Sequence, residues 1–158
     1  MTRSVLVTGG AGFIGVNFVY HWVARHPQDT LVVLDALTYA GNRNSLQPLE
    51  AAGAIHFVEG DICDAGLVAK VMADYAIDTI VHFAAESHVD RSITGPDAFI
   101  RTNLVGTHTL LEAARASWLG GAGRSHRFHH VSTDEVYGSL SADGPAFVET
   151  TRYEPHSP

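Results

Sequence analysis

The glycines that follow the first apolar run constrain the fold of this chain more than any other feature. Residues 4–8 are mostly apolar, and they lead directly into Gly9, Gly12 and Gly15, which are spaced by three residues. Glycine is required where a turn is tight and where the backbone must approach a phosphate closely. A helix that starts after such a turn presents unpaired N–H groups and a positive dipole to an anion. The pattern therefore predicts a phosphate-binding turn of a parallel α/β fold.

An acidic residue follows the second apolar run at the distance that a dinucleotide-binding turn requires. Asp35 comes directly after residues 31–34 and 20 residues after Gly15. A carboxylate at this place can accept hydrogen bonds from an adenosine ribose and repels a 2′-phosphate, so the pattern favours NAD over NADP as the cofactor. Arg43 is close in sequence and weakens this preference. The alternative for Asp35 is that it caps a helix or a turn.

Apolar runs alternate with amphipathic stretches along the whole chain. Strands are predicted at residues 4–8, 31–34, 55–58, 79–83 and 128–132, and the longest helix between them is predicted at about 96–118. Continuous apolar strands separated by helices indicate a parallel sheet covered on both faces, an α/β fold of the doubly wound, Rossmann-like type. We expect residues 1–138 to form this NAD-binding domain. Residues 139–158 are rich in Ser, Thr, Gly and Pro, which predicts a loop.

The composition excludes several classes of function. The formal net charge is −7 and Lys70 is the only lysine, so we expect no nucleic-acid partner. Cys63 is the only cysteine, which excludes an internal disulfide and a cysteine-type zinc site. His129 and His130 are adjacent on a predicted strand and point to opposite faces, so we expect no metal site. No apolar run approaches the roughly 20 residues that span a bilayer, so we expect a cytoplasmic protein without a membrane partner.

A second carboxylate follows the third predicted strand. Asp61 comes after Gly60 at the end of that strand. It can reach the amino group of an adenine from there. It can equally cap the helix that is predicted to begin near Asp64, and the sequence does not separate the two roles.

Three further segments connect the chain to a known family. They are Leu-Thr-Tyr-Ala-Gly-Asn at 37–42, Ala-Ala-Glu-Ser-His-Val-Asp-Arg-Ser at 84–92 and Val-Ser-Thr-Asp-Glu-Val-Tyr-Gly at 131–138. With the glycine turn they make the chain similar to the extended short-chain dehydrogenase/reductase family, and within it to the nucleotide-sugar 4,6-dehydratases that act on dTDP-glucose. The resemblance covers essentially the whole chain. Its most specific part is Thr133-Asp134-Glu135, since related epimerases usually carry small hydroxyl residues there.

The resemblance implies a reaction and a role for each residue of this triplet. In such dehydratases NAD removes a hydride from sugar C4, a base then takes the C5 proton while an acid protonates the departing C6 hydroxyl, and the hydride returns to C6. Asp134 would be the acid, Glu135 the base, and Thr133 would bind the C4 oxygen. Adjacent carboxylates favour the protonated form of one of them, which suits an acid–base pair. The alternative is a loop in which the three residues cap a helix.

The resemblance also implies contacts to the cofactor and the substrate. Ser87, together with Thr133, would face the sugar nucleotide. Many family members carry lysine where this chain has Ala36, which removes one positive charge near the adenosine. Phe83 and Ala84 can equally be packing residues at a strand end. The full set predicted to bind NAD is Gly9, Gly12, Phe13, Ile14, Gly15, Asp35, Ala36, Leu37, Thr38, Asp61, Ile62, Phe83, Ala84, Ala85, Glu86 and Thr102.

A Tyr-x-x-x-Lys pair, with which short-chain dehydrogenases deprotonate the substrate hydroxyl, is absent from the sequence. Gly66 stands four residues before Lys70, the only lysine. We therefore expect an N-terminal portion of a dehydratase, with 139–158 leading to an absent helix and substrate domain, poor activity alone and a homodimer for the complete protein. The alternatives are a non-catalytic NAD-binding module or remnant, and an epimerase or decarboxylase of the same fold.

Overall fold

The core of the protein is one parallel sheet of five strands. The computed structural model describes residues 2–120, 125–141 and 144–156. The sheet order is β3-β2-β1-β4-β5. The strands are β1 (Ser4–Thr8), β2 (Thr30–Asp35), β3 (His56–Glu59), β4 (Thr79–His82) and β5 (Arg127–His130). Because β1 pairs with both β2 and β4, the strand order reverses direction at β1, which is where doubly wound folds bind their ligands.

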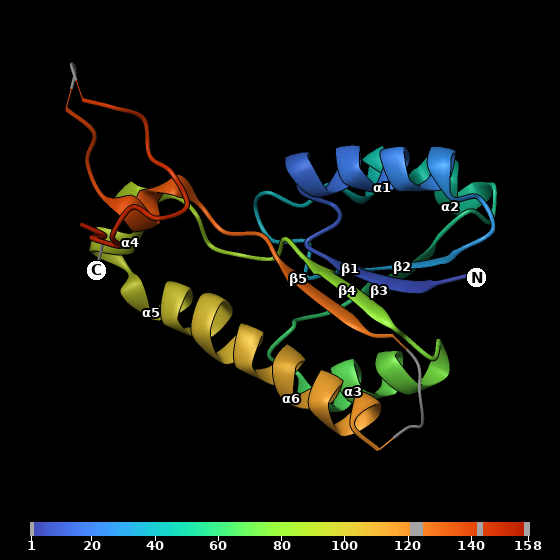
Figure 1. The fold of residues 1–158 in the computed structure, drawn as a ribbon. Coiled ribbons are helices and arrows are strands. Elements are labelled where there is room, and N and C mark those ends of the chain that lie inside the picture. Colours follow the sequence, from blue (N-terminus) through green and yellow to red (C-terminus); the bar gives the residue numbers. More distant parts are fainter. Residues whose placement is uncertain (1, 121–124, 142–143, 157–158) are drawn as a thin grey trace.

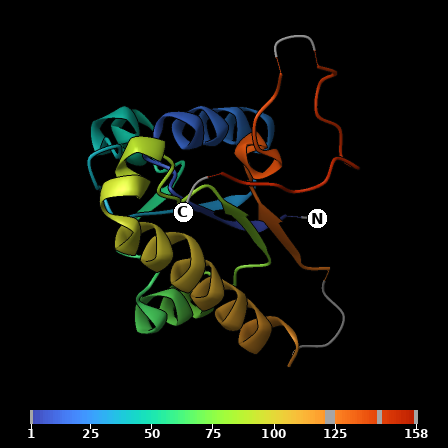
Figure 2. The ribbon, with the colours of Figure 1, turned by 90° about the vertical axis from the view of Figure 1, so that its left-hand side faces the viewer.

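Helices cover both faces of the sheet, as Figure 1 shows with α1 and α2 on one side and α3 and α6 on the other. The same separation is visible in the view turned by 90° (Figure 2). The helices are α1 (Phe13–Arg25), α2 (Gln47–Ala51), α3 (Ala65–Asp74), α4 (Val89–Thr94), α5 (Pro96–Phe99), α6 (Thr107–Trp118), the 3-10 helices η1 (Arg43–Ser45) and η3 (Asp134–Tyr137), and the π-helix η2 (Ile100–Gly106).

Alternating side chains of the central strands form the core on the two faces. Val5 and Val7 of β1 pack in a cluster with Val19 of α1. Leu6, between them in sequence, belongs to the opposite cluster with Leu110 of α6. This alternation is the period of two that a strand imposes, and both faces of β1 are apolar because both are covered by helices. The predicted α/β fold with a doubly wound parallel sheet is confirmed.

The boundaries of several elements differ from those predicted. The expected strands at 55–58 and 128–132 are found at His56–Glu59 and Arg127–His130, since pairing with the neighbouring strand, and not apolarity, decides where a strand begins. The long helix expected at 96–118 is divided into α5, the π-helix η2 and α6. Gly106 is the last residue of η2 and packs closely on the loop that follows β3. A Cβ added to Gly106 would lie 2.5 Å from Ile62 Cδ1.

The segment after β5 folds back on itself beyond the edge of the sheet. After η3, the described residues 139–141 and 144–156 contain no helix and no strand, and 142–143 and 157–158 lie outside the described residues. The backbone N–H of Glu154 donates to the Val136 carbonyl oxygen at 2.9 Å. The Tyr137 ring lies 5.2 Å from that of Phe147 and 5.4 Å from that of Tyr153. None of the helices that the structure describes is both long and apolar enough to span a membrane.

Candidate functional site

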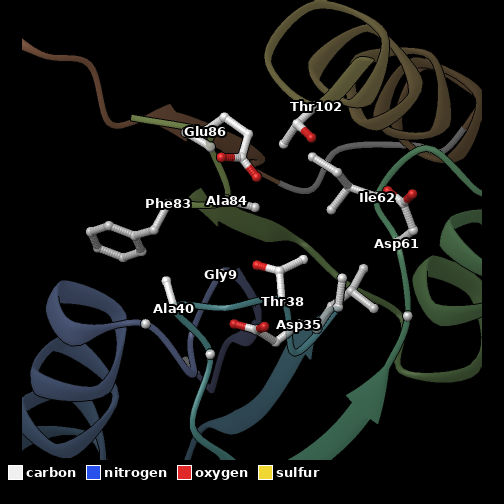
Figure 3. Close-up of a pocket in the computed structure, with 16 residues that line it drawn as sticks. Gly9, Asp35, Thr38, Ala40, Asp61, Ile62, Phe83, Ala84, Glu86 and Thr102 are labelled. Atoms are coloured by element: carbon white, nitrogen blue, oxygen red, sulfur yellow. The ribbon is translucent and has the colours of Figure 1, made fainter. Parts of the chain in front are cut away.

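A pocket opens at the carboxyl ends of the strands, where the order of the sheet reverses. Its walls come from the turn after β1, the loop after β2, the end of β3, the loop after β4 and the π-helix η2 (Figure 3). The residues that line it are Gly9, Gly12, Leu34, Asp35, Ala36, Thr38, Ala40, Gly41, Gly60, Asp61, Ile62, Phe83, Ala84, Ala85, Glu86 and Thr102. The structure thus brings together, around one cavity, residues that are up to 93 positions apart, from Gly9 to Thr102.

The glycine turn forms the floor of this pocket, and its shape requires glycine. Gly9 has φ +69°, and an added Cβ would lie 2.6 Å from the Ala84 nitrogen. A Cβ on Gly15 would overlap the carbonyl oxygen of Gly9 and lie 2.7 Å from Gly10 Cα. Gly12 is the N-cap of α1 and no side chain caps that helix end. The first N–H groups of α1 are therefore available to an anion such as a diphosphate.

Asp35 is a buried carboxylate at the end of β2 and one wall of the pocket. It is 8% exposed. One oxygen accepts from the Ala11 N–H and the other from the Leu37 N–H, each at 2.8 Å. The side chain therefore caps the turns after β1 and β2, which was one alternative for it, and it also faces the cavity. Each carboxylate oxygen keeps a second lone pair for a ligand hydroxyl.

The guanidinium of Arg43, whose charge near Asp35 in sequence weakened the prediction of NAD over NADP, is paired with two glutamates. Its guanidinium lies 2.7 Å from a Glu50 oxygen and 3.9 Å from a Glu59 oxygen. It also stacks over the Phe57 ring, 4.6 Å from the centroid. Arg43 is thus paired with other side chains and does not line the pocket, whereas Asp35 does.

Asp61 does not cap the helix that follows it. The N-cap of α3 is Asp64, whose side chain accepts from the Leu67 N–H at 3.0 Å. Asp61 instead accepts from the Cys63 N–H at 2.8 Å and from the Arg101 guanidinium at 3.1 Å. Partial burial opposes ionisation of Asp61, but these two hydrogen bonds outweigh it and hold the pKa of this carboxyl below its usual value. Asp61 is thus an ionised acceptor at the pocket wall.

The π-helix η2 fixes the loop that follows β4. The Asn103 side chain accepts from the backbone N–H of Glu86 and donates to its carbonyl oxygen, both at 2.8 Å. These two bonds satisfy both backbone groups of Glu86, as a neighbouring strand would, and so tie this point of the loop to η2. Sequence reasoning did not assign Asn103 a role at the site, because nothing local in the sequence pairs it with a residue 17 positions earlier.

The acid pair lies on a short turn beyond β5, at the same edge of the sheet as the pocket (Figure 1). Thr133 is the N-cap of η3, and its hydroxyl accepts from the Glu135 N–H at 3.3 Å. The capping role considered for this triplet is therefore present at Thr133. Asp134 and Glu135 are exposed in the first turn of η3, and Ser87 is exposed in the loop before α4. None of these four residues lines the pocket.

Most residues predicted to bind the cofactor line the pocket, and four do not. Phe13 and Ile14 are 86% and 64% exposed at the start of α1. Gly15 packs against the turn, and Leu37, at φ +50°, packs in the cluster on the α1 side. Four residues that line the pocket were not predicted: Leu34, Ala40, Gly41 and Gly60.

Beneath the pocket a buried histidine connects two strands and a helix. His82 is 1% exposed. Its Nδ1 lies 2.7 Å from the Thr8 hydroxyl and its Nε2 lies 3.0 Å from the Thr107 hydroxyl. Burial, with a smaller contribution from His130, lowers the pKa of His82 from 6.5 to about 4. The imidazole is therefore half protonated at a pH of about 4 and becomes predominantly neutral as the pH rises above that value.

The free energy of unfolding should consequently decrease as the pH is lowered below 6.5, and His82 should cause part of this decrease. Above pH 6.5 the side chain is neutral whether the protein is folded or unfolded. As pH falls from 6.5 towards 4, the unfolded chain binds a proton that the folded chain does not, so the free energy of unfolding decreases by about 1.4 kcal/mol per pH unit. Urea unfolding at pH 7.5 and 5.0 measures this loss. In His82→Asn the loss should be smaller by about 2 kcal/mol, whereas equal losses in both proteins would contradict the assignment.

The fold and the pocket define a class of protein. A doubly wound sheet with a glycine turn after β1, a carboxylate after β2 and a pocket at the reversal of strand order is a Rossmann-like fold. The profile of the family described as GDP-mannose 4,6 dehydratase matches residues 6–158. The chain belongs to this family.

Individual relatives agree with this membership. The chain is 54% identical to a dTDP-glucose 4,6-dehydratase of Mycobacterium tuberculosis (strain H37Rv), over 98% of this chain and 44% of the relative. The chain is also 50% identical in sequence to DesIV, a dTDP-glucose 4,6-dehydratase from Streptomyces venezuelae whose crystal structure contains NAD and TYD. The two structures superpose with a TM-score of 0.86, over 98% of this chain and 46% of DesIV.

An epimerase has a similar fold at lower identity. UDP-glucose 4-epimerase from Brucella ovis, solved in complex with NAD, is 30% identical with a TM-score of 0.81, over 99% of this chain and 43% of that chain. In all three comparisons the chain spans less than half the length of the protein that it matches.

Proposed function

We propose that this chain is part of an NAD-dependent nucleotide-sugar 4,6-dehydratase, a lyase that converts dTDP-glucose into dTDP-4-keto-6-deoxyglucose. The observation that supports this most is the pairing of two features at one sheet edge. They are the pocket around Asp35 and the turn that carries Asp134 and Glu135. An epimerase of the same fold has no need for such an acid pair, and the higher identity to dehydratases agrees with this distinction.

The residues of the pocket fit a dinucleotide. The glycine turn packs so closely on the backbone after β4 that a Cβ on Gly9 would lie 2.6 Å from the Ala84 nitrogen, and the uncapped start of α1 is open to a diphosphate. Asp35 would bind the hydroxyls of the adenosine ribose, and Asp61 and Ile62 would border the adenine. Glu86 and Thr102 line the wall opposite Asp35 (Figure 3). When bound, NAD supplies a hydride acceptor for sugar C4 and a hydride donor for C6.

The triplet on η3 would carry the proton transfers of the elimination. Glu135 would remove the proton from C5, and Asp134 would donate a proton to the hydroxyl that leaves C6, so that water departs and a C5–C6 double bond forms. Thr133 would bind the C4 oxygen while the ketone is present. Its hydroxyl accepts from the Glu135 N–H at 3.3 Å and donates to Asp134 Oδ1 at 3.5 Å, and this long second bond would be exchanged for one to the substrate. Ser87 would contact the sugar nucleotide from the β4 side.

The complete protein would need elements beyond these residues. Deprotonation of the C4 hydroxyl would use a Tyr-x-x-x-Lys pair, and this sequence contains none, because Gly66 stands four residues before Lys70, the only lysine. We propose that 1–138 is the dinucleotide-binding domain with the acid–base motif and that 139–158 connects it to a further helix and a substrate domain. We also propose a cytoplasmic location for the protein.

A homodimer of the complete protein is part of the same proposal. Ile100, Leu104 and Leu111 recur along η2 and α6 and are 53%, 64% and 47% exposed, and Ile93 on α4 is 66% exposed. Apolar side chains at such spacing lie along one side of a helix, and exposed apolar stripes of this kind usually pack against a partner.

Product analysis with the complete protein tests this function. Conversion of dTDP-glucose should give a product lighter by one water. Glu135→Gln should lower kcat roughly 100-fold or more, because a general base is lost, and should leave NAD+ affinity within about twofold. Glu149→Gln, the same chemical change at an exposed tail residue, is the control and should have no effect. A product of unchanged mass would favour an epimerase, and no reaction at all would favour a non-catalytic NAD-binding module.

A further inference from the structure

Two loops on opposite sides of the glycine turn contact each other across the pocket. Thr38, Ala40 and Gly41 line it from the loop after β2, and Glu86 lines it from the loop after β4. Figure 3 shows Glu86 on one wall and Thr38 and Ala40 on the other. The hydroxyl of Tyr39, between Thr38 and Ala40 in sequence, donates to Glu86 Oε2 at 3.1 Å.

This contact must pass over the glycine turn. β1 lies between β2 and β4 in the sheet and is paired with both of them. A bond between the loop after β2 and the loop after β4 therefore spans the turn that follows β1. The Tyr39–Glu86 bond accordingly joins the two loops that flank the place where a diphosphate on the glycine turn would be held.

A third side chain and a fixed backbone support the contact from the β4 side. The Arg91 guanidinium, on α4, stacks over the Tyr39 ring at 3.9 Å from the centroid. Asn103 holds the Glu86 backbone through both its N–H and its carbonyl oxygen. Partial burial and the Glu86 carboxylate raise the pKa of Tyr39, so the phenol keeps the proton that it donates. Tyr39 is nevertheless 52% exposed, so the contact can open without unfolding the core.

We propose that Tyr39, Glu86 and Arg91 form a clasp over the glycine turn that must open before a dinucleotide can enter or leave the pocket. Tyr39 and Arg91 are then positioning residues that set the rate of cofactor exchange. The inference rests on the proposed function, because it assumes that the pocket binds a dinucleotide. Because the same contact has to open for entry and for exit, the clasp slows association as well as dissociation.

Stopped-flow fluorescence with NADH tests the clasp on the 158-residue chain. Tyr39→Phe removes the hydroxyl and keeps the ring under Arg91. Both the association and the dissociation rate constants should rise roughly fivefold, the effect of one hydrogen bond to a charged group at a half-exposed site, and Kd should stay within about twofold. Tyr20→Phe is the matched control, because the Tyr20 hydroxyl donates to the Ser45 carbonyl oxygen at 3.0 Å outside the pocket.

Three results would overturn the proposal, and they differ from one another. Unchanged rate constants in Tyr39→Phe would show that the contact does not control exchange. A rise in the dissociation rate constant alone would mean that the hydroxyl contacts the ligand directly and is not a gate. A wild-type chain that binds no NADH would refute the proposed function, and the clasp with it.

Amide hydrogen exchange gives a readout that needs no ligand. If the clasp joins the two loops, Tyr39→Phe should accelerate exchange at 38–41 and at 84–88 together, while Tyr20→Phe should change neither. Faster exchange in only one loop would contradict a connection between them.

Discussion

Replacing Gly15 by alanine is expected to lower the free energy of unfolding by about 3 kcal/mol and to abolish measurable NAD+ binding. The new Cβ would overlap the Gly9 carbonyl oxygen and lie 2.7 Å from Gly10 Cα. Both of these atoms belong to the backbone, so no side-chain rotation can relieve the overlap. The turn therefore has to move away from α1. The N–H groups at the start of α1 would then lose their position relative to the turn. Urea unfolding and calorimetric titration with NAD+ measure the two effects.

Gly120→Ala is the control for the Gly15 substitution. Gly120 follows α6, and in the part of the chain that the structure describes no atom beyond its chain neighbours lies within 4 Å of the place of its Cβ. This change should leave both the free energy of unfolding and NAD+ affinity unchanged. If Gly15→Ala behaved in the same way, the close approach of helix and turn would not be essential to the site.

Replacing Asp35 by alanine is expected to produce the second-largest change. The Ala11 and Leu37 N–H groups would lose their common acceptor in a buried place, which should lower the free energy of unfolding by about 3 kcal/mol. The ribose would lose its hydrogen-bond acceptor as well, so NAD+ affinity should fall roughly 100-fold. Unfolding in urea and titration with NAD+ again provide the two measurements.

Asp35→Asn separates the structural role of this residue from its charge. The amide keeps the shape of the carboxylate, but its single oxygen can accept from only one of the two N–H groups. We expect a smaller loss of stability than in Asp35→Ala and a reduced preference for NAD+ over NADP+. An unchanged preference would mean that the charge of Asp35 does not discriminate between the two cofactors.

The elements that the sequence predicted well are those in which one local pattern carries the information. The strand–glycine–helix order at Gly9, Gly12 and Gly15 and the distance to Asp35 predicted the pocket floor and its acidic wall. The alternation of apolar runs predicted the parallel sheet, because both faces of a covered strand must be apolar. In each case the physical requirement acts on residues that are neighbours in sequence.

The features that the sequence did not reveal depend on contacts between distant segments. Asn103 binds the backbone of Glu86, and the division of the long helix by η2 accompanies this contact. The clasp joins Tyr39 to Glu86, 47 positions later. Asp61 had two equally plausible roles until the structure assigned the helix cap to Asp64. No pattern of propensity or spacing distinguishes such pairs, since they are selected by the packing of the complete fold.

Paired calorimetric titrations of the chain with NAD+ and NADP+ test the central claim most directly. The claim is that the pocket at the reversal of strand order is a dinucleotide site whose acidic wall is Asp35. We predict that NAD+ binds with a stoichiometry of about one and that NADP+ binds roughly 100-fold more weakly, because its 2′-phosphate would face a buried carboxylate. Equal affinities, or no binding of either dinucleotide, would contradict the account.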